Sequence, residues 1–428
     1  MKEFDEVIGY EDVKAELERI VDMMVNPGKY QALGVNTTRG LLLDGEPGVG
    51  KTLMGECFIK ASKRKSFTIR KDVPDGDFIK LIKKTFDEAK NTAPSIVFLD
   101  DIDKFANEDA HHKNVEQFVT IQSCIDDCKG IEVFVLATAN DTSFLPSSLL
   151  RAGRFDKNIT IDAPRGKDAE DIVRYYLKQK KVAKNVDCKE VARLLNGRSC
   201  ASLETVINEA GIYAGFENRE YISMNDLTKS FMRVIYNAPE SIDLKESKYL
   251  RNIAVHEAGH VVVGEILEPE SVSFATCKKH DGKRGGGFTI YERDDDYFES
   301  KHFMENRVVT LLAGRAAIEV IYGVTDVGAN NDLHGAFKIV ERFVDNYCGF
   351  GFQYWEGCAS SSSNSLLERK IQLVQTETER YYQKAKKIII ENREFLDKVV
   401  DVLVDKKTIV FNEIQGIKMY CKNNPTIY

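Results

Sequence analysis

A phosphate-binding loop pattern constrains this chain more than any other feature of its sequence. Residues 45–52 read GEPGVGKT, which fits the pattern GxxxxGK[ST], and they directly follow the apolar run at residues 41–43. The glycines let backbone N–H groups turn inward around phosphate oxygens, Lys51 supplies a cation, and Thr52 offers a hydroxyl to Mg²⁺. Chance would produce this pattern roughly 0.02 times in a chain of this composition. The loop therefore predicts an α/β domain in which a strand leads into a nucleotide-binding turn.

Short aliphatic runs alternate with helix-like stretches on both sides of this loop. We expect strands at residues 40–44, 66–70, 95–100, 131–138 and 157–161, and the alternation predicts a mostly parallel sheet. From residue 168 to about residue 214 the apolar residues fall at helical spacings, which predicts a small helical domain. A linker is expected around Pro239, and the remaining chain reads as mainly helical, with one strand at residues 288–291 after a glycine run.

Length and composition limit the classes of protein that fit. A chain of 428 residues is expected to form two to four domains, and its 43% hydrophobic residues suffice to build their cores. The 60 basic against 67 acidic residues give a formal charge of -7, which argues against nucleic acid as a partner. No apolar run is long enough for a membrane span, and the N-terminus has no secretory pattern. Nine cysteines without a CxxC pair indicate free thiols and a cytoplasmic location.

Two adjacent carboxylates end the expected buried strand at residues 95–100. Asp100 is the expected partner of Mg²⁺, and Asp101 would polarise the attacking water, because phosphoryl transfer needs little beyond positioning and charge stabilisation. Asn140 follows the next expected strand, where its amide would help to orient that water. Taken alone, acidic residues here could cap a helix and Asn140 could be a turn residue, but the phosphate loop favours the catalytic reading.

A second motif, HEAGH at residues 256–260, lies in a segment that reads as a helix from residue 250 to 267. The i, i+4 spacing places His256 and His260 on one helix face, about one turn apart, where they can share a Zn²⁺ ion. Glu257 lies beside them and can take a proton from a water molecule that zinc activates. The alternative, a core helix with two incidental histidines, is a poor fit because the chain has only seven histidines.

A catalytic zinc site normally has three protein ligands, so a third must come from elsewhere in the chain. Asp332 stands at the start of an expected helix, where a carboxylate is also favourable simply because of the helix dipole. Glu319 and His334 are the rival ligands. The residues alone leave the three candidates open.

The order of the nucleotide motifs resembles that of the AAA+ ATPase module. The resemblance is carried by residues 4–9, the phosphate loop, the strand that ends at Asp100 and Asp101, residues 137–140, and LLRAGRFD at residues 149–156. It implies that Arg151 and Arg154 act as arginine fingers on a neighbouring subunit, and hence a homo-oligomeric ring, usually a hexamer. Tyr176 stands where many relatives carry a histidine near the adenine. We expect ATP and Mg²⁺ to contact Ile8, Gly9, Gly45, Glu46, Pro47, Gly48, Val49, Gly50, Lys51, Thr52, Leu53 and Asp100.

Both sites together resemble the FtsH family of AAA+ zinc proteases, over nearly the whole chain from Phe4 to about Ile417. Residues 328–333, GANNDL, are similar to the segment that provides the family's aspartate ligand, which favours Asp332 over its rivals. Residues 285–291 correspond to the edge strand near the zinc, where an extended peptide would bind by strand addition. The resemblance implies an AAA+ nucleotide-binding domain at residues 1–166, a helical lid at 167–238, and a mainly helical zinc peptidase domain at 239–428.

Three departures from the family pattern affect the functional hypothesis. The family is normally anchored by N-terminal transmembrane helices, so this sequence is either a cytoplasmic relative or a trimmed, membrane-anchored one. Asp101 stands where the family has glutamate, so its carboxylate would lie farther from the water, and hydrolysis would be slower or would need a different water position. Residues 71–78 occupy the region of the substrate-gripping pore loop but lack its aromatic-aliphatic-glycine signature, and Phe78 is the one aromatic candidate for gripping or for the core.

These features lead to one principal functional hypothesis and two alternatives. The principal one is an ATP-dependent zinc endopeptidase that unfolds protein substrates and translocates them to the zinc site. The first alternative is a zinc peptidase that cuts only unstructured polypeptides and whose ATPase ring serves gating or assembly. The second is a nucleotide-regulated remodelling or scaffold ring.

Overall fold

A computed structural model of the protein describes residues 1–35, 38–106, 115–151, 153–238, 248–279, 286–292, 300–325, 328–347, 349–351 and 364–423. The chain forms two compact units: Met1–Lys184 with Leu195–Ile222, and Asn185–Leu194 with Ser223–Tyr428. Ala152, Pro239 and Gly285, on which parts of the sequence predictions fall, lie outside the described residues. None of the described helices combines the length and the apolar character needed to cross a membrane.

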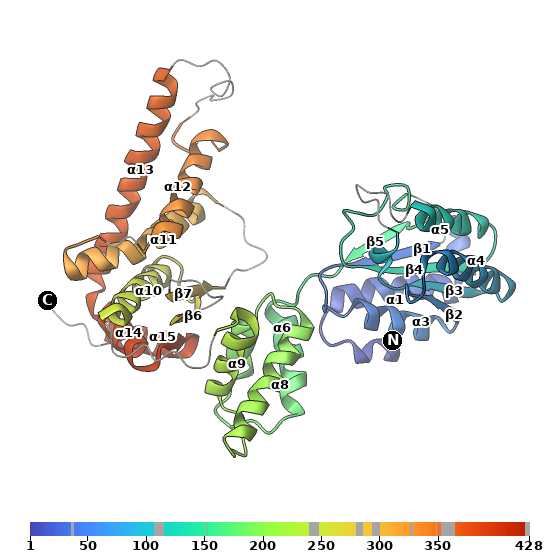
Figure 1. Ribbon diagram of the computed structural model, residues 1–428, viewed down its shortest axis with the longest axis horizontal. Helices are drawn as coiled ribbons and strands as arrows, with labels where there is room; N and C mark the ends of the chain where they lie inside the picture. The colour runs from blue at the N-terminus through green and yellow to red at the C-terminus, as the bar shows by residue number, and fades with distance from the viewer. Residues whose placement is uncertain are drawn as a thin grey trace. The chain divides into compact units, whose positions relative to one another are not determined.

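The first unit is built on a five-stranded sheet in the order β2-β3-β4-β1-β5, in which every pair of neighbours is parallel (Figure 1). This confirms the expected parallel α/β architecture. The strands are β1 Gly40–Asp44, β2 Lys65–Ile69, β3 Ser95–Leu99, β4 Val133–Ala139 and β5 Lys157–Thr160.

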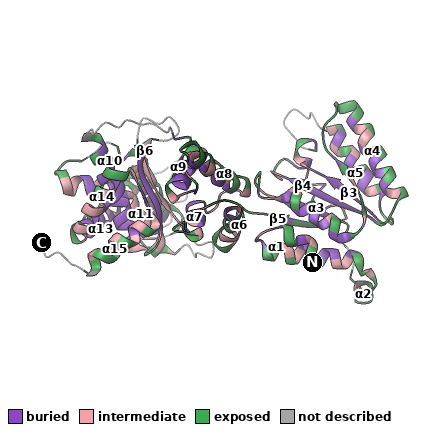
Figure 2. Ribbon diagram, turned by 90° about the horizontal axis from the view of Figure 1, so that it is seen from below, coloured by how far each residue is buried: buried purple, intermediate pink, exposed green. Residues whose placement is uncertain are grey.

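Helices cover both faces of this sheet because its central strands are apolar on both faces (Figures 1 and 2). Leu42, Val97 and Val135 belong to the core on the α4 and α5 face. On the opposite face the α3 side chain of Phe58 packs against Phe134. The helical elements of this unit are η1 Lys2–Glu6, α1 Glu11–Val25, α2 Pro27–Gln31, α3 Lys51–Ser62, α4 Asp75–Asn91, η2 Ile102–Lys104, α5 Val115–Asp127, α6 Gly166–Lys178 and α8 Cys200–Phe216.

The strand order positions the nucleotide motifs. Since β4 lies between β1 and β3, the carboxyl ends of these three parallel strands are neighbours at one edge of the sheet. The phosphate loop follows β1, Asp100 and Asp101 follow β3, and Asn140 follows β4. Ligands of open α/β sheets bind at this edge, so segments far apart in sequence meet there.

The second unit is mainly helical, as expected for the C-terminal part of the chain. Its core is formed largely by α10, α11, α13 and α14, with residues such as Val262, Leu312, Ile389 and Val400 fully or almost fully buried. Its helices are α7 Cys188–Leu194, α9 Met224–Tyr236, α10 Lys248–Leu267, α11 Lys301–Tyr322, α12 Asn330–Asp345, α13 Asn364–Glu391, α14 Arg393–Lys406 and α15 Phe411–Asn423.

A small antiparallel sheet in the order β7-β6-β8 completes the second unit. Its strands are β6 Val272–Lys279, β7 Gly286–Tyr291 and β8 Thr408–Val410. The sequence predicted β7 but neither of the other two strands. The helices expected to form a lid are present, but α6 and α8 belong to the first unit whereas α7 and α9 belong to the second. The domain boundaries at residues 166 and 238 stay a prediction.

Candidate functional site

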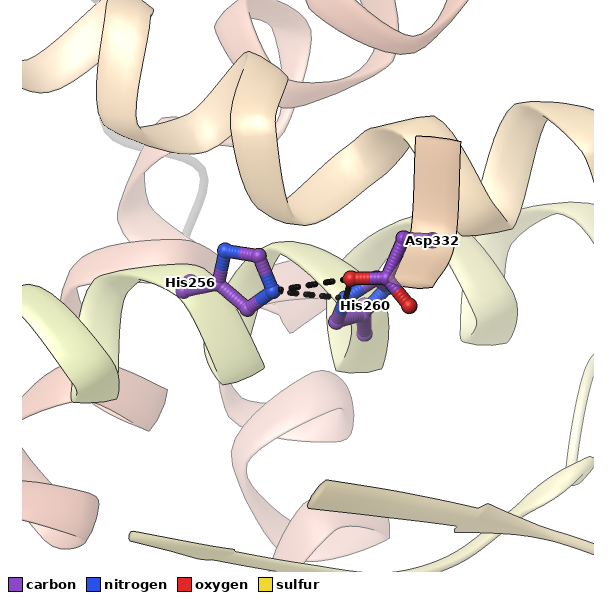
Figure 3. Close-up of side chains that lie close together, drawn as sticks. All are labelled: His256, His260 and Asp332. Atoms are coloured by element: carbon purple, nitrogen blue, oxygen red, sulfur yellow. Dashed lines mark hydrogen bonds and ion pairs between the residues drawn. The ribbon is translucent and has the colours of Figure 1, made fainter. Parts of the chain in front are cut away.

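Helix α10 places the two histidines of the HEAGH segment against α11 (Figure 3). Two glycines permit this close approach. A Cβ atom at Gly259 would lie 2.5 Å from the carbonyl oxygen of Ala313, and one at Gly314 would lie 2.5 Å from the imidazole ring of His256. The helix spacing predicted that His256 and His260 share a face, and the glycines give that face room beside its neighbour.

His256, His260 and Asp332 come together in one cluster (Figure 3). Asp332 lies in the first turn of α12. Its Oδ2 atom is 3.2 Å from His256 Nε2 and 3.5 Å from His260 Nε2, and the two Nε2 atoms are 3.1 Å apart. Ligand atoms about 2.0–2.1 Å from a tetrahedral zinc ion would be separated by roughly 3.3 Å. The three donors therefore fit a zinc ion, and two nitrogens with one carboxylate oxygen are a donor set that zinc accepts.

The surroundings of the cluster prepare its donors for a cation. His260 Nδ1 lies 2.8 Å from the carbonyl oxygen of Thr310, which accepts its hydrogen, so Nε2 is the ligand atom once a metal ion displaces the proton from it. Burial raises the pKa of Asp332, but hydrogen bonds and charge from His256 and His260 outweigh burial and hold that pKa well below its ordinary value. The carboxylate is therefore ionised at neutral pH.

Glu257 is buried next to the cluster, with its side chain directed to β7. Thr289 Oγ1 donates a hydrogen bond to Glu257 Oε2 at 2.9 Å. A Cβ atom at Gly287, where φ is +96°, would lie 2.6 Å from Glu257 Oε1. Burial raises the pKa of Glu257, while the nearby histidines and the Thr289 hydrogen bond act in the opposite direction. A buried carboxylate with a raised pKa is suited to accept a proton near neutral pH.

The rival zinc ligands do not join this cluster. Glu319, on α11, accepts hydrogen bonds from Lys386 Nζ at 2.7 Å and from Tyr382 Oη at 2.5 Å, both on α13. His334 lies on α12, and it is not part of the cluster that His256, His260 and Asp332 form among the described residues. The geometry therefore supports Asp332 as the third ligand.

The phosphate loop has the backbone that the sequence predicts. Gly45, Gly48 and Gly50 have φ values of +148°, +81° and +102°, which side-chain-bearing residues rarely adopt. Lys51 is buried, and its Nζ atom donates to the carbonyl oxygens of Gly45 at 2.7 Å and Glu46 at 2.8 Å. It also donates to Asn140 Oδ1 at 3.0 Å. The loop, Lys51 and Asn140 are therefore together, as a phosphate site requires.

Asp100 joins the loop to the strands beside it. Its Oδ1 atom accepts hydrogen bonds from Thr52 Oγ1 at 3.2 Å and from Thr138 Oγ1 at 2.8 Å. Its Oδ2 atom accepts one from Arg70 Nε at 2.7 Å. A hydroxyl and a carboxylate side by side fit Mg²⁺, which prefers oxygen ligands, so the residues present suit a magnesium-bound nucleotide.

Asp101 lies beside Asn140 in a left-handed backbone conformation, with φ of +57°. Its Oδ1 atom accepts a long hydrogen bond of 3.4 Å from Asn140 Nδ2, and its Oδ2 atom contacts Lys104 Nζ at 2.5 Å. The backbone N–H of Asp101 donates to Thr138 Oγ1 at 2.8 Å. Both residues expected to position the water therefore lie close to each other, and a cation accompanies the carboxylate.

The two candidate arginine fingers differ in their surroundings. Arg154 forms a paired contact with Asp126 on α5, with Nη2 to Oδ2 at 2.8 Å, and donates from Nη1 to the carbonyl oxygen of Ser148 at 2.5 Å. Arg151 is exposed, and its side chain has no hydrogen-bond or ion-pair partner among the described residues. Arg151 is thus free to reach another molecule, whereas Arg154 would first have to leave Asp126.

The expected adenine-side residues lie around α6 and α8. Gly9 has a φ of +71°, and the next residue, Tyr10, donates its backbone N–H to Asp168 Oδ1 at 2.8 Å. Ile8 and Gly9 therefore run next to the start of α6. Tyr176 donates to Glu204 Oε2 at 3.4 Å, and Leu53 is partly exposed on α3. These contacts assign no nucleotide role to Tyr176.

The segment expected at the pore loop contains no exposed aromatic side chain. Phe78 lies on α4, is fully buried, and packs edge-to-face on Phe105 with ring centroids 5.1 Å apart. The sequence left open whether Phe78 grips the substrate or packs in the core, and the structure places it in the core. Val73 is the exposed large apolar side chain of residues 71–78.

Four side chains that contact the site carboxylates Asp100, Asp101 and Glu257 were missed by the sequence analysis: Arg70, Lys104, Thr138 and Thr289. Strand alternation could have singled out Thr289, because residues 287, 289 and 291 share one face of β7. All three contact α10, and Tyr291 donates to the carbonyl oxygen of His260 at 3.2 Å. Nothing in the pattern around Arg70 or Lys104 distinguishes them from other surface cations.

Two family models match this chain. Residues 41–163 match the ATPase family associated with various cellular activities (AAA), and residues 243–417 match peptidase family M41. The first match contains the phosphate loop, both aspartates and both arginines. The second contains the cluster of His256, His260 and Asp332, together with Glu257.

Curated relatives match along almost the whole chain. It is 30% identical over 97% of its length to ATP-dependent zinc metalloprotease FtsH 2 of Phytoplasma mali, and spans 62% of that protein. The chain is 30% identical to ATP-dependent zinc metalloprotease FtsH of Thermus thermophilus and spans 70% of that protein. It is 28% identical to ATP-dependent zinc metalloprotease FtsH of Bacillus subtilis and spans 69% of that protein. The first two relatives, from Phytoplasma mali and Ureaplasma parvum, are each covered over 62% of their length.

Proposed function

We propose that this chain, which belongs to the FtsH family of ATP-dependent zinc metalloproteases, is a zinc endopeptidase that uses ATP hydrolysis to deliver protein substrates to its peptidase site. The observation that carries the proposal is the convergence of His256, His260 and Asp332 beside the buried Glu257. Two sites of different chemistry on one chain match the two parts of this activity.

At the peptidase site, His256, His260 and Asp332 would hold zinc. A bound zinc ion would lower the pKa of a water molecule to about 7 and polarise the scissile carbonyl. Glu257 would accept the proton of the attacking water and later give it to the leaving amine. Thr289 holds Oε2 of Glu257, and Gly287 leaves space beside Oε1, so one carboxylate oxygen is fixed and the other can receive the proton.

At the nucleotide site, Lys51, Thr52 and Asp100 would bind the phosphates and magnesium of ATP. Asp101 and Asn140 would orient the attacking water, since phosphoryl transfer depends chiefly on positioning and charge. Arg151 and Arg154 would complete the site of the next subunit in a homo-oligomeric ring, for which we propose a hexamer. The exposure of Arg151 supports this assignment most directly.

Strand β7 is the proposed docking edge for the substrate. It is at the end of the small sheet, it is half-buried along its length, and among described strands it pairs only with β6. An extended peptide could add to its free edge by main-chain hydrogen bonds. Because Thr289 and Glu257 are in contact, such a peptide would run next to the catalytic carboxylate. We place this chemistry in the cytoplasm.

The burial of Phe78 favours a second candidate function. Without an exposed aromatic residue at positions 71–78, the ring has less to grip when it pulls a folded protein. The chain would then cleave polypeptides that are already unstructured, and ATP would gate or assemble the peptidase rather than drive unfolding.

Degradation of matched substrates separates these functions. The zinc-loaded protein is incubated with a folded protein and with its permanently unfolded variant, in the presence of ATP, ADP or no nucleotide. Glu257→Gln serves as the peptidase control and Lys51→Ala as the nucleotide control. The proposal predicts that the folded substrate is degraded only when ATP is present, and that either substitution abolishes this degradation.

Other outcomes identify a different function. Cleavage confined to the unfolded substrate and unaffected by Lys51→Ala would support the gating function and contradict ATP-driven unfolding. Absence of cleavage of either substrate, with ATP turnover intact, would contradict the peptidase and favour a remodelling ring.

A further inference from the structure

Arg70 forms an ion pair with the carboxylate that we assign to magnesium. Its Nε atom lies 2.7 Å from Asp100 Oδ2. The side chain of Asp100 is 7% exposed, whereas that of Arg70 is 56% exposed. A buried carboxylate thus meets a cation that approaches it from the solvent side.

Strand register brings this cation to the site. Ile69, the last residue of β2, pairs with Leu99, the last residue of β3, and the backbone N–H of Asp100 donates to the carbonyl oxygen of Ile69 at 3.1 Å. Arg70 and Asp100 are therefore equivalent positions on neighbouring strands, just past the edge of the sheet. The strand pairing therefore places the two residues side by side, within reach of an ion pair.

Asp100 accepts hydrogen bonds from three protein side chains. Thr52 and Thr138 donate to Oδ1, and Arg70 donates to Oδ2. Magnesium binds through carboxylate oxygens, phosphates and water, and it requires negative charge from its ligands. A guanidinium on Asp100 neutralises that charge and repels a second cation.

We propose that Arg70 acts as an internal counter-ion to Asp100 that opposes Mg²⁺ and so sets the magnesium requirement for nucleotide binding. The inference rests on the proposed nucleotide site. Arg70 is a positioning residue in this scheme: it acts on the nucleotide through Asp100. Removing its charge should increase the amount by which Mg²⁺ strengthens nucleotide binding.

The test uses a fluorescent ATP analogue with a non-hydrolysable β–γ linkage. The quantity measured is its dissociation constant in EDTA divided by its dissociation constant at saturating Mg²⁺. In Arg70→Gln this ratio should rise by roughly fivefold, the upper range for a partly exposed ion pair. Arg70→Lys keeps the charge and should restore the original ratio. Lys71→Gln is the matched control, because Lys71 pairs with Asp75 on α4, 3.0 Å away.

Each result decides the question. A higher ratio in Arg70→Gln alone supports the proposal. An unchanged or lower ratio in Arg70→Gln overturns it, as does an equal rise in Lys71→Gln, which would indicate a general effect of surface charge. If the unmodified chain binds no nucleotide in either condition, the proposed nucleotide site itself is wrong, and this failure is distinct from an unchanged ratio.

Discussion

Replacing Thr289 with valine should slow peptide cleavage while leaving the zinc ligands intact. The two side chains have nearly the same shape, so the substitution removes one hydroxyl and little packing. That hydroxyl donates to Glu257 Oε2 at 2.9 Å inside a buried site. Without it, one oxygen of a buried carboxylate loses the hydrogen bond that fixes its orientation.

The expected loss follows from the strength of this hydrogen bond. Hydrogen bonds to charged groups contribute about 1.5–3 kcal/mol. Since each 1.4 kcal/mol corresponds to about tenfold in rate, kcat should fall by roughly 10- to 150-fold. The loss should appear in kcat more than in KM, because Thr289 contacts the base on one face of β7 while the substrate would add to the strand's main chain.

The pH profile provides a second readout. The Thr289 hydrogen bond favours the ionised form of Glu257 and lowers its pKa, against the burial that raises it. Valine removes the opposing effect, so the pKa of Glu257 rises and a larger fraction of the base is protonated at low pH. The acid limb of kcat/KM should therefore move to higher pH.

A quenched fluorescent peptide, assayed from pH 5 to pH 9 in the presence of ATP, gives kcat, KM and the acid limb together. Thr289→Ser is the matched control, because serine keeps the hydroxyl and should recover most of the rate. Zinc content is measured in parallel by elemental analysis. A kcat within twofold of the original enzyme, with an unmoved acid limb, would refute the role assigned to Thr289.

Three further substitutions test other parts of the structure. Asp332→Asn should weaken zinc binding by at least about tenfold in a competition assay with a chelator, because a charged ligand becomes neutral, and unchanged affinity would exclude Asp332 as a ligand. Asp101→Glu should increase ATP turnover, measured by phosphate release at unchanged nucleotide affinity, because the longer side chain extends farther toward the water; equal turnover would show that carboxylate length does not limit hydrolysis. Lys418→Met should destabilise the second unit by about 3–5 kcal/mol in urea unfolding, because it leaves the fully buried Glu265, 2.7 Å away, without its cation. As the control, Lys406→Met removes a more exposed ion pair and should cost about 1 kcal/mol or less.

The elements that carry the motifs could be predicted closely from the sequence. The expected strand at residues 40–44 coincides with β1, and the other four large-sheet strands begin and end within two residues of the prediction. Such strands are buried on both faces, so they appear as continuous apolar runs between polar turns. Helix α10 begins two residues before its predicted start and ends at Leu267, as predicted.

The small sheet of the second unit was less accessible to sequence reasoning. β8 has three residues, Thr408–Val410, which is too short to show an alternating pattern. β6 is buried along most of its length and mixes apolar with small polar residues, so its sequence shows no clear alternation that would separate a strand from a helix. β8 pairs with β6, which lies more than 100 residues earlier in the sequence, and such long-range pairing is a tertiary property.

The side chains that contact Asp100 and Asp101 were also not predictable from the sequence alone. The phosphate loop and the position of Asp100 follow from local patterns, but the cation that meets Asp100 depends on strand order and register. Because β2 neighbours β3, Arg70 reaches Asp100, while Lys104 meets Asp101 through one turn of local helix. Lys51 in turn bonds to the carbonyl oxygens of its own loop. In the proposed nucleotide site, ATP and magnesium would bind by exchanging partners: phosphate oxygens would replace loop carbonyls on Lys51, and magnesium would compete with a guanidinium at Asp100. The affinity for ATP would then depend on the difference between two sets of electrostatic contacts. On this proposal, the cations around the phosphate loop affect that affinity as much as the loop itself.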